Sequence, residues 1–487
     1  MKTFVNRVSE WLWVILLALL PISSMPLVVE LVGSDTVAAP SGLILFLLLL
    51  IWLIPFLLKG AIIPRECVPF LIFILFTVLS TLLSVYLPIP TYNDINPLRG
   101  QVIALLTLGV GLSFYLLTTL FIRDEVILYK TLRIINWSGL VMLLWAFTQW
   151  AWWTFFSHYP EWMREIHALY SIGPLYRQRA TGFAVEPSWL AHQLNMLYIP
   201  LWLASSIRSF TAHKWKVYNV NFENILLVLG VVVLFLTFSR VGLIALFLMI
   251  GYLLLRVNAW AVRWLQNKVI LRWSQQLNSQ RVSRWVISTA IGAGLIMIYL
   301  VILFGVGYGL SQLDPRMKDL FTFSSAQQNA LLEYAHRLNF DTRLVYWQAA
   351  WNTFNDYPWL GVGLGNVGFY FPEKLGSFAW KLVEVRNLIY RSSVLLNSKS
   401  LWLRLLAETG LVGFSIFTAW LASLWAASES RDKAKLTCVR MLSLFGRFVL
   451  LALLIEGFSV DSFALPYIWV ALGLATAACH LNKTENS

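Results

Sequence analysis

The chain has 487 residues, of which 59% are hydrophobic and only 13% are charged, whereas soluble domains carry about 25% charged residues. This composition excludes a soluble multi-domain fold, and apolar runs that are continuous and do not alternate argue against a β-barrel. A net charge of +13 would suggest nucleic-acid binding in a soluble protein, but the excess of Lys and Arg in the cytoplasmic loops of membrane proteins accounts for it here.

The apolar runs predict an all-α polytopic membrane protein with about twelve transmembrane helices, because each run is close to the length that crosses the hydrocarbon core. The predicted spans are 11–32, 41–58, 67–88, 101–121, 134–156, 187–206, 223–239, 241–256, 285–310, 411–428, 441–461 and 465–481. We expect residues 1–487 to form a single integral membrane domain.

Lys and Arg gather at alternate ends of these spans, which predicts their orientation. The basic ends would face the cytoplasm, and both termini would then be cytoplasmic. Two long segments, 157–186 and 311–410, fall on the opposite, outer face. The larger, 311–410, is a large outer loop in which Asp341 precedes Leu344, Trp347 and three- or four-residue repeats of apolar residues, the pattern of an amphipathic helix.

Charged side chains mark the start of the sixth span. Arg177 and Arg179 precede Gly182, and Glu186 comes directly before Pro187. Proline suits the first helical turn, and a carboxylate suits the positive end of the helix dipole. Gly182 permits close approach of a ligand, so Arg179 is a candidate anion-binding residue. Glu186 is a candidate proton acceptor, and its alternative is a capped, solvated helix start.

One arginine, Arg240, stands between two apolar runs, 225–239 and 241–255. A charge this close to hydrocarbon costs roughly 2.5–3.5 kcal/mol on insertion scales, so it usually has a partner or a function. The planar guanidinium matches phosphate geometry. The position therefore predicts an anionic headgroup site at one membrane face, with snorkelling to the lipid headgroups as the alternative.

Two more groups of candidates lie in and after the large outer loop. Arg343 opens the predicted amphipathic helix, and a glycine run, 361–365, follows that helix. Lys399 and Glu408 lie in the segment 398–413, which runs from the outer loop into the tenth span. Either side chain is a candidate base, and Lys399 is alternatively a phosphate-binding charge. The alternative for Glu408 is a structural partner of a nearby arginine.

Glu456 lies within the eleventh span, and we expect it to be paired with an outer arginine. The histidines and cysteines show no metal-ligand spacing, so no metal site is predicted.

Taken in order, these motifs resemble the O-antigen ligase and O-antigen polymerase family. The resemblance covers roughly residues 177–413: Arg…Gly-Phe…Glu-Pro-Ser before a helix, Ser-Arg between two spans, an Arg…Trp helix followed by Pro…Gly-x-Gly, and Leu…Glu-x-Gly-x-x-Gly. Members have a helical bundle similar to GT-C glycosyltransferases. They transfer a glycan from an undecaprenyl-diphosphate carrier to an acceptor glycan or lipid on the outer face of the inner membrane, without a cofactor.

Carried over to this chain, the resemblance implies that Arg179, Arg240 and Arg343 bind the donor diphosphate. The acceptor hydroxyl needs a base, and Lys399, Glu186 and Glu408 are the candidates for that catalytic role. The chain departs from the family at Lys399, where members have a histidine, and Ser400 takes the family's Asn or Ser place. This departure favours an O-antigen or exopolysaccharide polymerase over a ligase that transfers glycan to lipid A-core.

A second class of function is an anion transporter, similar to putative bicarbonate carriers. A carrier would place its charges near the membrane midplane, often in two related halves. In this chain the candidate cations fall toward one face, and the two halves differ. Glycan transfer is therefore the favoured interpretation.

Overall fold

The computed structural model describes residues 2–33, 38–93, 95–218, 220–265, 284–313, 335, 340–391 and 395–481. The chain forms two compact units. The first contains Met1–Ala245 and Val345–Ser487, and the second contains Leu246–Leu344. Of the predicted outer loop 311–410, residues 314–334, 336–339 and 392–394 lie outside the described part of the chain.

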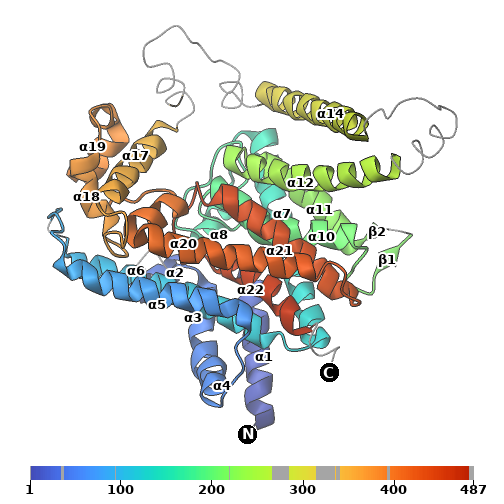
Figure 1. The fold of residues 1–487 in the computed structure, drawn as a ribbon, viewed down its shortest axis with the longest axis horizontal. Helices are drawn as coiled ribbons and strands as arrows, with labels where there is room; N and C mark the ends of the chain where they lie inside the picture. The colour runs from blue at the N-terminus through green and yellow to red at the C-terminus, as the bar shows by residue number, and fades with distance from the viewer. Residues whose placement is uncertain are drawn as a thin grey trace. The chain divides into compact units, whose positions relative to one another are not determined.

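Almost all regular structure is helical (Figure 1). The elements are α1 (Lys2–Ala18), α2 (Pro26–Val32), α3 (Pro40–Leu48), η1 (Leu49–Leu53), α4 (Ile54–Leu58), η2 (Arg65–Cys67), α5 (Val68–Leu83), η3 (Ser84–Tyr86), α6 (Pro97–Phe121), α7 (Glu125–Phe156), α8 (Glu161–Tyr170), α9 (Pro187–Gln193), η4 (Leu194–Tyr198), α10 (Ile199–Ile207), β1 (Lys216–Val217), β2 (Val220–Asn221), α11 (Phe222–Leu236), α12 (Arg240–Leu265), α14 (Arg284–Leu313), α17 (Asp341–Asp356), α18 (Val367–Lys374), η7 (Ala379–Lys381), α19 (Val383–Arg391), α20 (Leu401–Ser430), α21 (Thr437–Glu456) and α22 (Pro466–Leu481). The two strands pair antiparallel, with Lys216 opposite Asn221.

Eight helices of the described chain are long and apolar enough to cross a membrane. They are Pro40–Leu58, Arg65–Tyr86, Pro97–Phe121, Glu125–Phe156, Arg240–Ala259, Gly292–Gly309, Leu401–Ser430 and Thr437–Glu456. Two shorter apolar helices, Phe222–Leu236 and Pro466–Cys479, accompany them. The predicted fold class, an all-α polytopic membrane protein, is thus confirmed.

The predicted first span, 11–32, is wrong as a single helix. α1 ends at Ala18, and α2 begins only at Pro26. Pro21 and Pro26 lack the backbone N–H that a continuing helix needs, and proline disfavours helical geometry in the residue before it. The two prolines therefore divide the run, and neither α1 nor α2 is among the helices long and apolar enough to cross a membrane.

In the first unit, helices pack closely where a glycine faces an aromatic ring or where two aromatic rings stack. α6 packs on α22, where a Cβ at Gly111 would come within 2.5 Å of the Trp469 ring. α5 packs on α20 through the stacked rings of Phe70 and Trp420, whose centroids are 4.2 Å apart. Small residues let membrane helices approach closely, which is a main source of association energy when lipid surrounds the bundle. Figure 1 shows α5 and α20 running side by side.

The helices of the predicted outer loop build a small core of their own. The helix expected after Asp341 is confirmed as α17, but its buried face consists of Val345, Tyr346, Ala349 and Ala350. The predicted apolar stripe is mostly half-buried: the ring centroids of Trp347 and Phe458 lie 5.5 Å apart, and only Trp351 is well exposed, at 48%.

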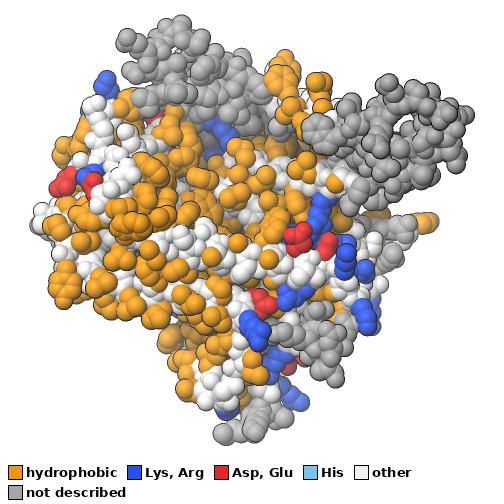
Figure 2. Space-filling view, in the orientation of Figure 1, with side chains coloured by type: hydrophobic (Ala, Val, Ile, Leu, Met, Phe, Trp, Pro, Cys, Tyr) orange, Lys and Arg blue, Asp and Glu red, His pale blue; other side chains and the backbone are white. Residues whose placement is uncertain are grey.

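The visible face of the molecule separates apolar from charged side chains. Figure 2 shows hydrophobic side chains along the helices, and Lys, Arg, Asp and Glu gathered toward the turn between α20 and α21. At that turn Asp432 accepts a hydrogen bond from Arg447 at 2.6 Å and also pairs with Arg208. Arg431 pairs with Glu66 at 2.8 Å. These charges lie near the C-terminal end of α20, whereas Lys399 precedes its N-terminal end.

Candidate functional site

The loop 171–186, which joins α8 to α9, is held in place by a buried glutamine. Gln149 of α7 is fully buried, and its Oε1 accepts from the backbone N–H groups of Thr181 and Gly182 at 3.2 and 2.8 Å. Its Nε2 donates to the carbonyl of Gly182 at 3.2 Å. Buried, satisfied polar networks rigidify what they bind, so this loop presents its arginines from a fixed backbone.

Arg179 reaches from this loop to the hairpin between α11 and α12. Its Nε donates to the carbonyl of Thr237 at 2.9 Å, and the backbone N–H of Ala180 donates to the carbonyl of Leu236 at 3.0 Å. Arg240 begins α12 three residues after Thr237. The structure therefore brings the segments of Arg179 and Arg240 together, although 60 residues separate them in sequence.

The hairpin itself has a strained turn. Phe238 has φ +48°, a left-handed conformation that is an outlier for a bulky residue. Strained backbone of this kind persists only where its surroundings hold it, and it concentrates at functional sites. Arg240 follows directly after this turn and Ser239 and is half-buried.

The first turn of α12 is tied to α21 through one asparagine. Asn195 Nδ2 donates to the carbonyl of Gly242 at 2.8 Å and to Glu456 Oε1 at 2.7 Å. Asn195 lies in the π-helical segment η4, and such segments often occur at functional sites. Glu456 is 1% exposed, so the expectation that it needs a partner is met by Asn195. Its pairing with an arginine stays a prediction.

Lys399 occupies an unusual backbone position next to a carboxylate. Its φ is +49°, and its backbone N–H donates to Asp461 Oδ2 at 3.1 Å. The ammonium forms an ion pair with Glu384 of α19 and lies 5.1 Å from the ring centroid of Tyr346. The Tyr346 side chain is fully buried, and its hydroxyl has no hydrogen-bond partner among the described residues. A cation thus lies between a carboxylate and the ring of a buried tyrosine.

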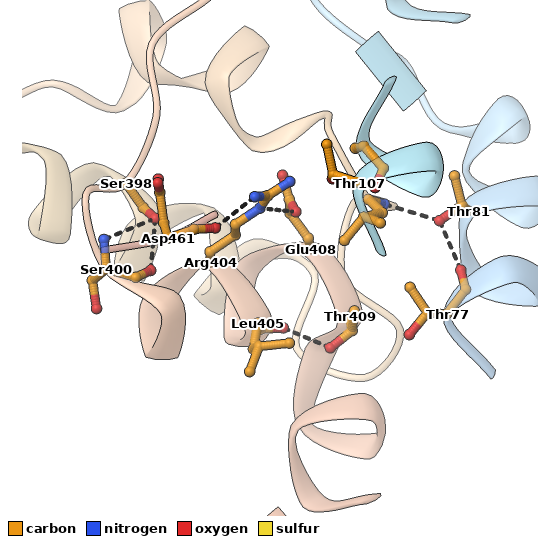
Figure 3. Close-up of polar contacts among 12 residues, drawn as sticks. Thr77, Thr81, Thr107, Ser398, Ser400, Arg404, Leu405, Glu408, Thr409 and Asp461 are labelled. Carbon is orange, nitrogen blue, oxygen red and sulfur yellow. Dashed lines mark hydrogen bonds and ion pairs between the residues drawn. The ribbon is translucent and has the colours of Figure 1, made fainter. Parts of the chain in front are cut away.

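Glu408 lies one helical turn after Arg404 and is bound by it. Arg404 Nε is 2.8 Å from Glu408 Oε2, and the Glu408 side chain is only 2% exposed. Arg404 Nη1 also donates to the carbonyl of Asp461 at 2.6 Å. Figure 3 shows Arg404 between Glu408 and Asp461. These surroundings match the alternative predicted for Glu408, a structural partner of an arginine.

The C-terminal turn of α21 joins the two groups of candidates. Glu456 binds Asn195, which also binds the first turn of α12. The next residue, Gly457, accepts from the backbone N–H of Leu401 at 2.7 Å and from the Ser400 hydroxyl at 3.3 Å. The start of α12, with Arg240, and the start of α20, with Lys399, are therefore anchored on adjacent residues.

The two remaining candidates lie on different elements. Glu186 is the exposed residue before α9, and its Oε2 accepts from the Ser188 hydroxyl at 2.9 Å. It shares the loop of Arg179, and Tyr176 of the same loop is near both charges. Arg343 lies in the first turn of α17, in the second unit, and is half-buried. Its place in a phosphate site stays a prediction.

The glycine run after α17 is a packing device. Val362 N donates to the carbonyl of Ala407 at 2.9 Å and Gly363 N to that of Glu408 at 3.0 Å. On the far side of Gly410, which breaks α20 with φ +63° and ψ −171°, Leu411 N donates to the carbonyl of Pro358 at 2.7 Å. The segment that contains the glycine run is therefore hydrogen-bonded to α20 on both sides of the break at Gly410, so its glycines serve helix packing.

We expect Gly361→Ala to destabilise the protein by about 1–3 kcal/mol. Gly361 has φ +70°, and an added Cβ would meet the Glu408 carbonyl carbon at 2.4 Å. Gly376→Ala is the matched control, because its nearest contact is a side-chain oxygen at 3.7 Å. Thermal unfolding in detergent measures both. Equal unfolding temperatures for the two variants would contradict this packing role.

A family comparison now bears on these residues. A family model described as O-antigen ligase matches residues 225–418. Residues 225–418, less than half of the chain, are thus similar to the O-antigen ligase family. No curated protein matches the chain. The matched segment contains Arg240, Arg343, Lys399 and Glu408, whereas Arg179 and Glu186 lie before it. The match supports the predicted family and indicates an O-antigen ligase-family function.

Several residues of this candidate site could not be selected from sequence. Glu384 and Tyr346 meet Lys399 only because α17 and α19 pack together. Asn195 and Gln149 are single amides inside apolar spans, where their hydrogen-bond partners are distant in sequence. The one available signal was their polarity, because buried amides in membrane helices need partners. Among the described residues, no three His, Cys, Asp or Glu side chains gather as metal ligands.

A buried histidine makes the Arg179 loop sensitive to pH. His167 is 4% exposed, with Nε2 2.9 Å from the carbonyl of Gly173 and Nδ1 2.9 Å from the Tyr170 hydroxyl. The carbonyl requires a proton on Nε2, so in neutral His167 the nitrogen without a proton is Nδ1, which faces the Tyr170 hydroxyl. Burial lowers the pKa of His167 below its usual value.

We therefore expect neutral His167 to contribute to the free energy of unfolding. This contribution is fully present above about pH 6.5, the usual histidine pKa, and is lost as pH falls through the lower pKa of His167 in the folded state. The unfolding temperature should drop between pH 7 and pH 5 in the wild type, and less in His167→Gln, which cannot titrate there. The same drop in both proteins would show that His167 does not carry the effect.

Proposed function

We propose that this protein is a membrane glycosyltransferase that uses a polyprenyl-diphosphate-linked glycan as donor. Its diphosphate would be bound by Arg179 and Arg240, with Arg343 as a third ligand. The observation that carries the proposal is the hydrogen bond from Arg179 Nε to the Thr237 carbonyl, 2.9 Å long. It holds a second guanidinium beside the turn that ends in Arg240. A lipid-linked donor enters from the bilayer, so its diphosphate would arrive at such a membrane-end hairpin.

The proposed reaction is a displacement at the anomeric carbon of the donor sugar. An acceptor hydroxyl oxygen forms the new bond to that carbon, and the bond from the carbon to the diphosphate oxygen breaks. The diphosphate leaves on the polyprenol and gains negative charge, while the hydroxyl proton passes to a base. Cations already aimed at the leaving group stabilise this charge without reorganisation.

For the base, Lys399 with Glu384 is the best-supported choice. The pair offers a positive group for a phosphate or sugar hydroxyl and a carboxylate that can accept the proton. Tyr346 adds a hydroxyl with no hydrogen-bond partner among the described residues. Glu186 is exposed on the Arg179 loop and remains a second candidate. Glu408 is engaged by Arg404, which favours a structural role for it.

We favour a polymerase, which extends lipid-linked O-antigen or exopolysaccharide, and keep the lipid A-core ligase as the alternative. Both use the same donor end, and the substitution of Lys399 for the family's histidine favours the polymerase. We further propose a GT-C-like bundle in the inner membrane with cytoplasmic termini. Reaction on the outer face then follows, because Arg179, Arg240 and Lys399 lie on segments expected there.

The test is a proteoliposome assay with purified full-length protein and undecaprenyl-diphosphate-linked repeat units. We expect longer lipid-linked glycan together with released undecaprenyl diphosphate. Product formed only after lipid A-core is added would identify the ligase. Bicarbonate flux without diphosphate release would support the transporter and end the proposal.

A further inference from the structure

A cavity lies beside the loop that carries Arg177 and Arg179. A cavity of about 610 Å³ opens between the C-terminal end of α7, the helix α8 and residues 171–177. This volume is within the range of small-molecule sites, roughly 300–1,000 Å³. Its lining includes Trp153, Arg164, His167 and Arg177. We call it the α7–α8 cavity.

The two arginines of this loop, Arg177 and Arg179, contact different parts of the protein. Gln178 between them has φ +59°, a left-handed residue that turns the chain. Arg179 contacts the α11–α12 hairpin, whereas Arg177 lines the α7–α8 cavity. One rigid loop therefore carries a cation to each of two separate places.

The cavity combines cations with an aromatic wall. Arg177 lies 5.9 Å from the ring centroid of Trp153. Arg164 contributes a second guanidinium, and its contact with Glu161 is long, 3.9 Å between two well-exposed side chains. An exposed pair of that kind contributes little, so the Arg164 charge remains available. Aromatic faces pack against the apolar faces of sugar rings, and guanidinium groups bind carboxylate and phosphate.

The base of the cavity is fixed. His167 is bound at both ring nitrogens, and the Tyr159 hydroxyl donates to the carbonyl of Tyr176 at 2.7 Å. A Cβ at Gly173 would lie 2.4 Å from the Val185 carbonyl oxygen, so this turn is tightly packed. The cavity therefore has a preformed shape, which lowers the entropic cost of binding.

The exposed face of α8 has the composition of a helix at a membrane surface. α8 exposes Trp162, Ile166 and Leu169 on one face, the last to 70%. Arg164, His167 and Ala168 face the cavity instead. A short helix with exposed apolar residues on one face suits the boundary between headgroups and water. A ligand at that depth is a headgroup or a glycan that extends from a lipid.

We propose that the α7–α8 cavity binds an anionic saccharide, a sugar with a carboxylate or phosphate in the glycan part of a substrate. This inference rests on the proposed glycan-transfer function and adds a substrate class to it. Trp153 would stack on the sugar ring, and Arg164 and Arg177 would bind the acidic group. The cavity would hold the glycan while Arg179 and Arg240 hold the diphosphate.

The experiment measures binding to the full-length protein in phosphatidylcholine nanodiscs. The probes are hyaluronan hexasaccharide, which carries carboxylates, and neutral chitohexaose. We expect the acidic probe to bind at least about tenfold more tightly, and the double variant Arg164→Gln/Arg177→Gln to lose that preference. A tenfold change is about 1.4 kcal/mol. The control Arg386→Gln/Arg391→Gln removes two exposed cations of α19 and should bind as the wild type does.

Three outcomes would overturn the inference. These are equal binding of the two probes, an unchanged preference in the double variant, and loss of binding when anionic phosphatidylglycerol replaces phosphatidylcholine, which would mark a lipid-headgroup site. Arg240→Ala separates this inference from the proposed function. It should bind hyaluronan normally even though it cannot turn over the donor, so a failed transfer assay leaves the binding result intact.

Discussion

Arg240→Ala is expected to abolish glycan transfer while leaving the protein folded and inserted in the membrane. Removing one preorganised group that stabilises a developing negative charge costs roughly 100- to 1,000-fold in rate. Arg240 follows a strained turn and is half-buried beside the segment that Arg179 contacts. The measurement is the length distribution of surface glycan, together with the rate of diphosphate release in proteoliposomes.

Arg65→Ala is the matched control for this experiment. Arg65 is exposed and lies next to Glu66, which pairs with Arg431 after the end of α20. It is thus at the end of the bundle away from Lys399, and its loss should leave transfer unchanged. Normal glycan lengths in Arg240→Ala would rule out its role in donor binding.

Lys399→His is expected to retain or raise activity, whereas Lys399→Ala should lower kcat by roughly 100-fold or more, as removal of a group in proton transfer does. The backbone supplies a reason. Residue 399 has φ +49°, and histidine is enriched several-fold in this left-handed region relative to most side chains. A histidine here would also lie beside the Glu384 carboxylate and Tyr346.

Glu384→Gln provides the companion measurement. If the carboxylate accepts the proton or orients the group that does, kcat falls and the acidic limb of the pH–rate profile changes, with little change in the KM for donor. Arg386→Gln, on the same helix and exposed, is the control. A folded but inactive Lys399→His variant would mean that position 399 does not correspond to the family's histidine.

The fold was predictable because hydrophobic run length alone identifies membrane helices. The hairpin at 236–240 was predictable too, because Arg240 interrupts a long apolar stretch. What sequence could not supply was the division of the first apolar run by Pro21 and Pro26 into α1 and α2. A hydropathy window averages over such positions, whereas α1 ends before Pro21 and α2 begins at Pro26.

The candidate residues of the site could be predicted from the sequence, but the hydrogen bonds and ion pairs that connect their elements could not. Arg179, Arg240 and Lys399 are unusual residues in unusual places, which is a local signal. Their connections run through Asn195, Glu456 and Glu384, and each of these bonds spans a large sequence separation, 261 residues for Asn195 to Glu456. No periodicity encodes such a bond. The buried face of α17 was likewise misjudged, because its tertiary neighbours bury Val345 and Ala349 and leave Trp351 exposed.

The break in α20 has a mechanical consequence. The peptide groups of residues 358–363 are bonded to the helix both before and after Gly410, at Ala407, Glu408 and Leu411. Because these hydrogen bonds hold the helix on both sides of Gly410, we expect the angle of the break to stay fixed and not to act as a hinge. In the proposed transfer reaction, exchange of substrate and product would then depend on movement of other elements, and we expect the Lys399 end of α20 to keep one orientation.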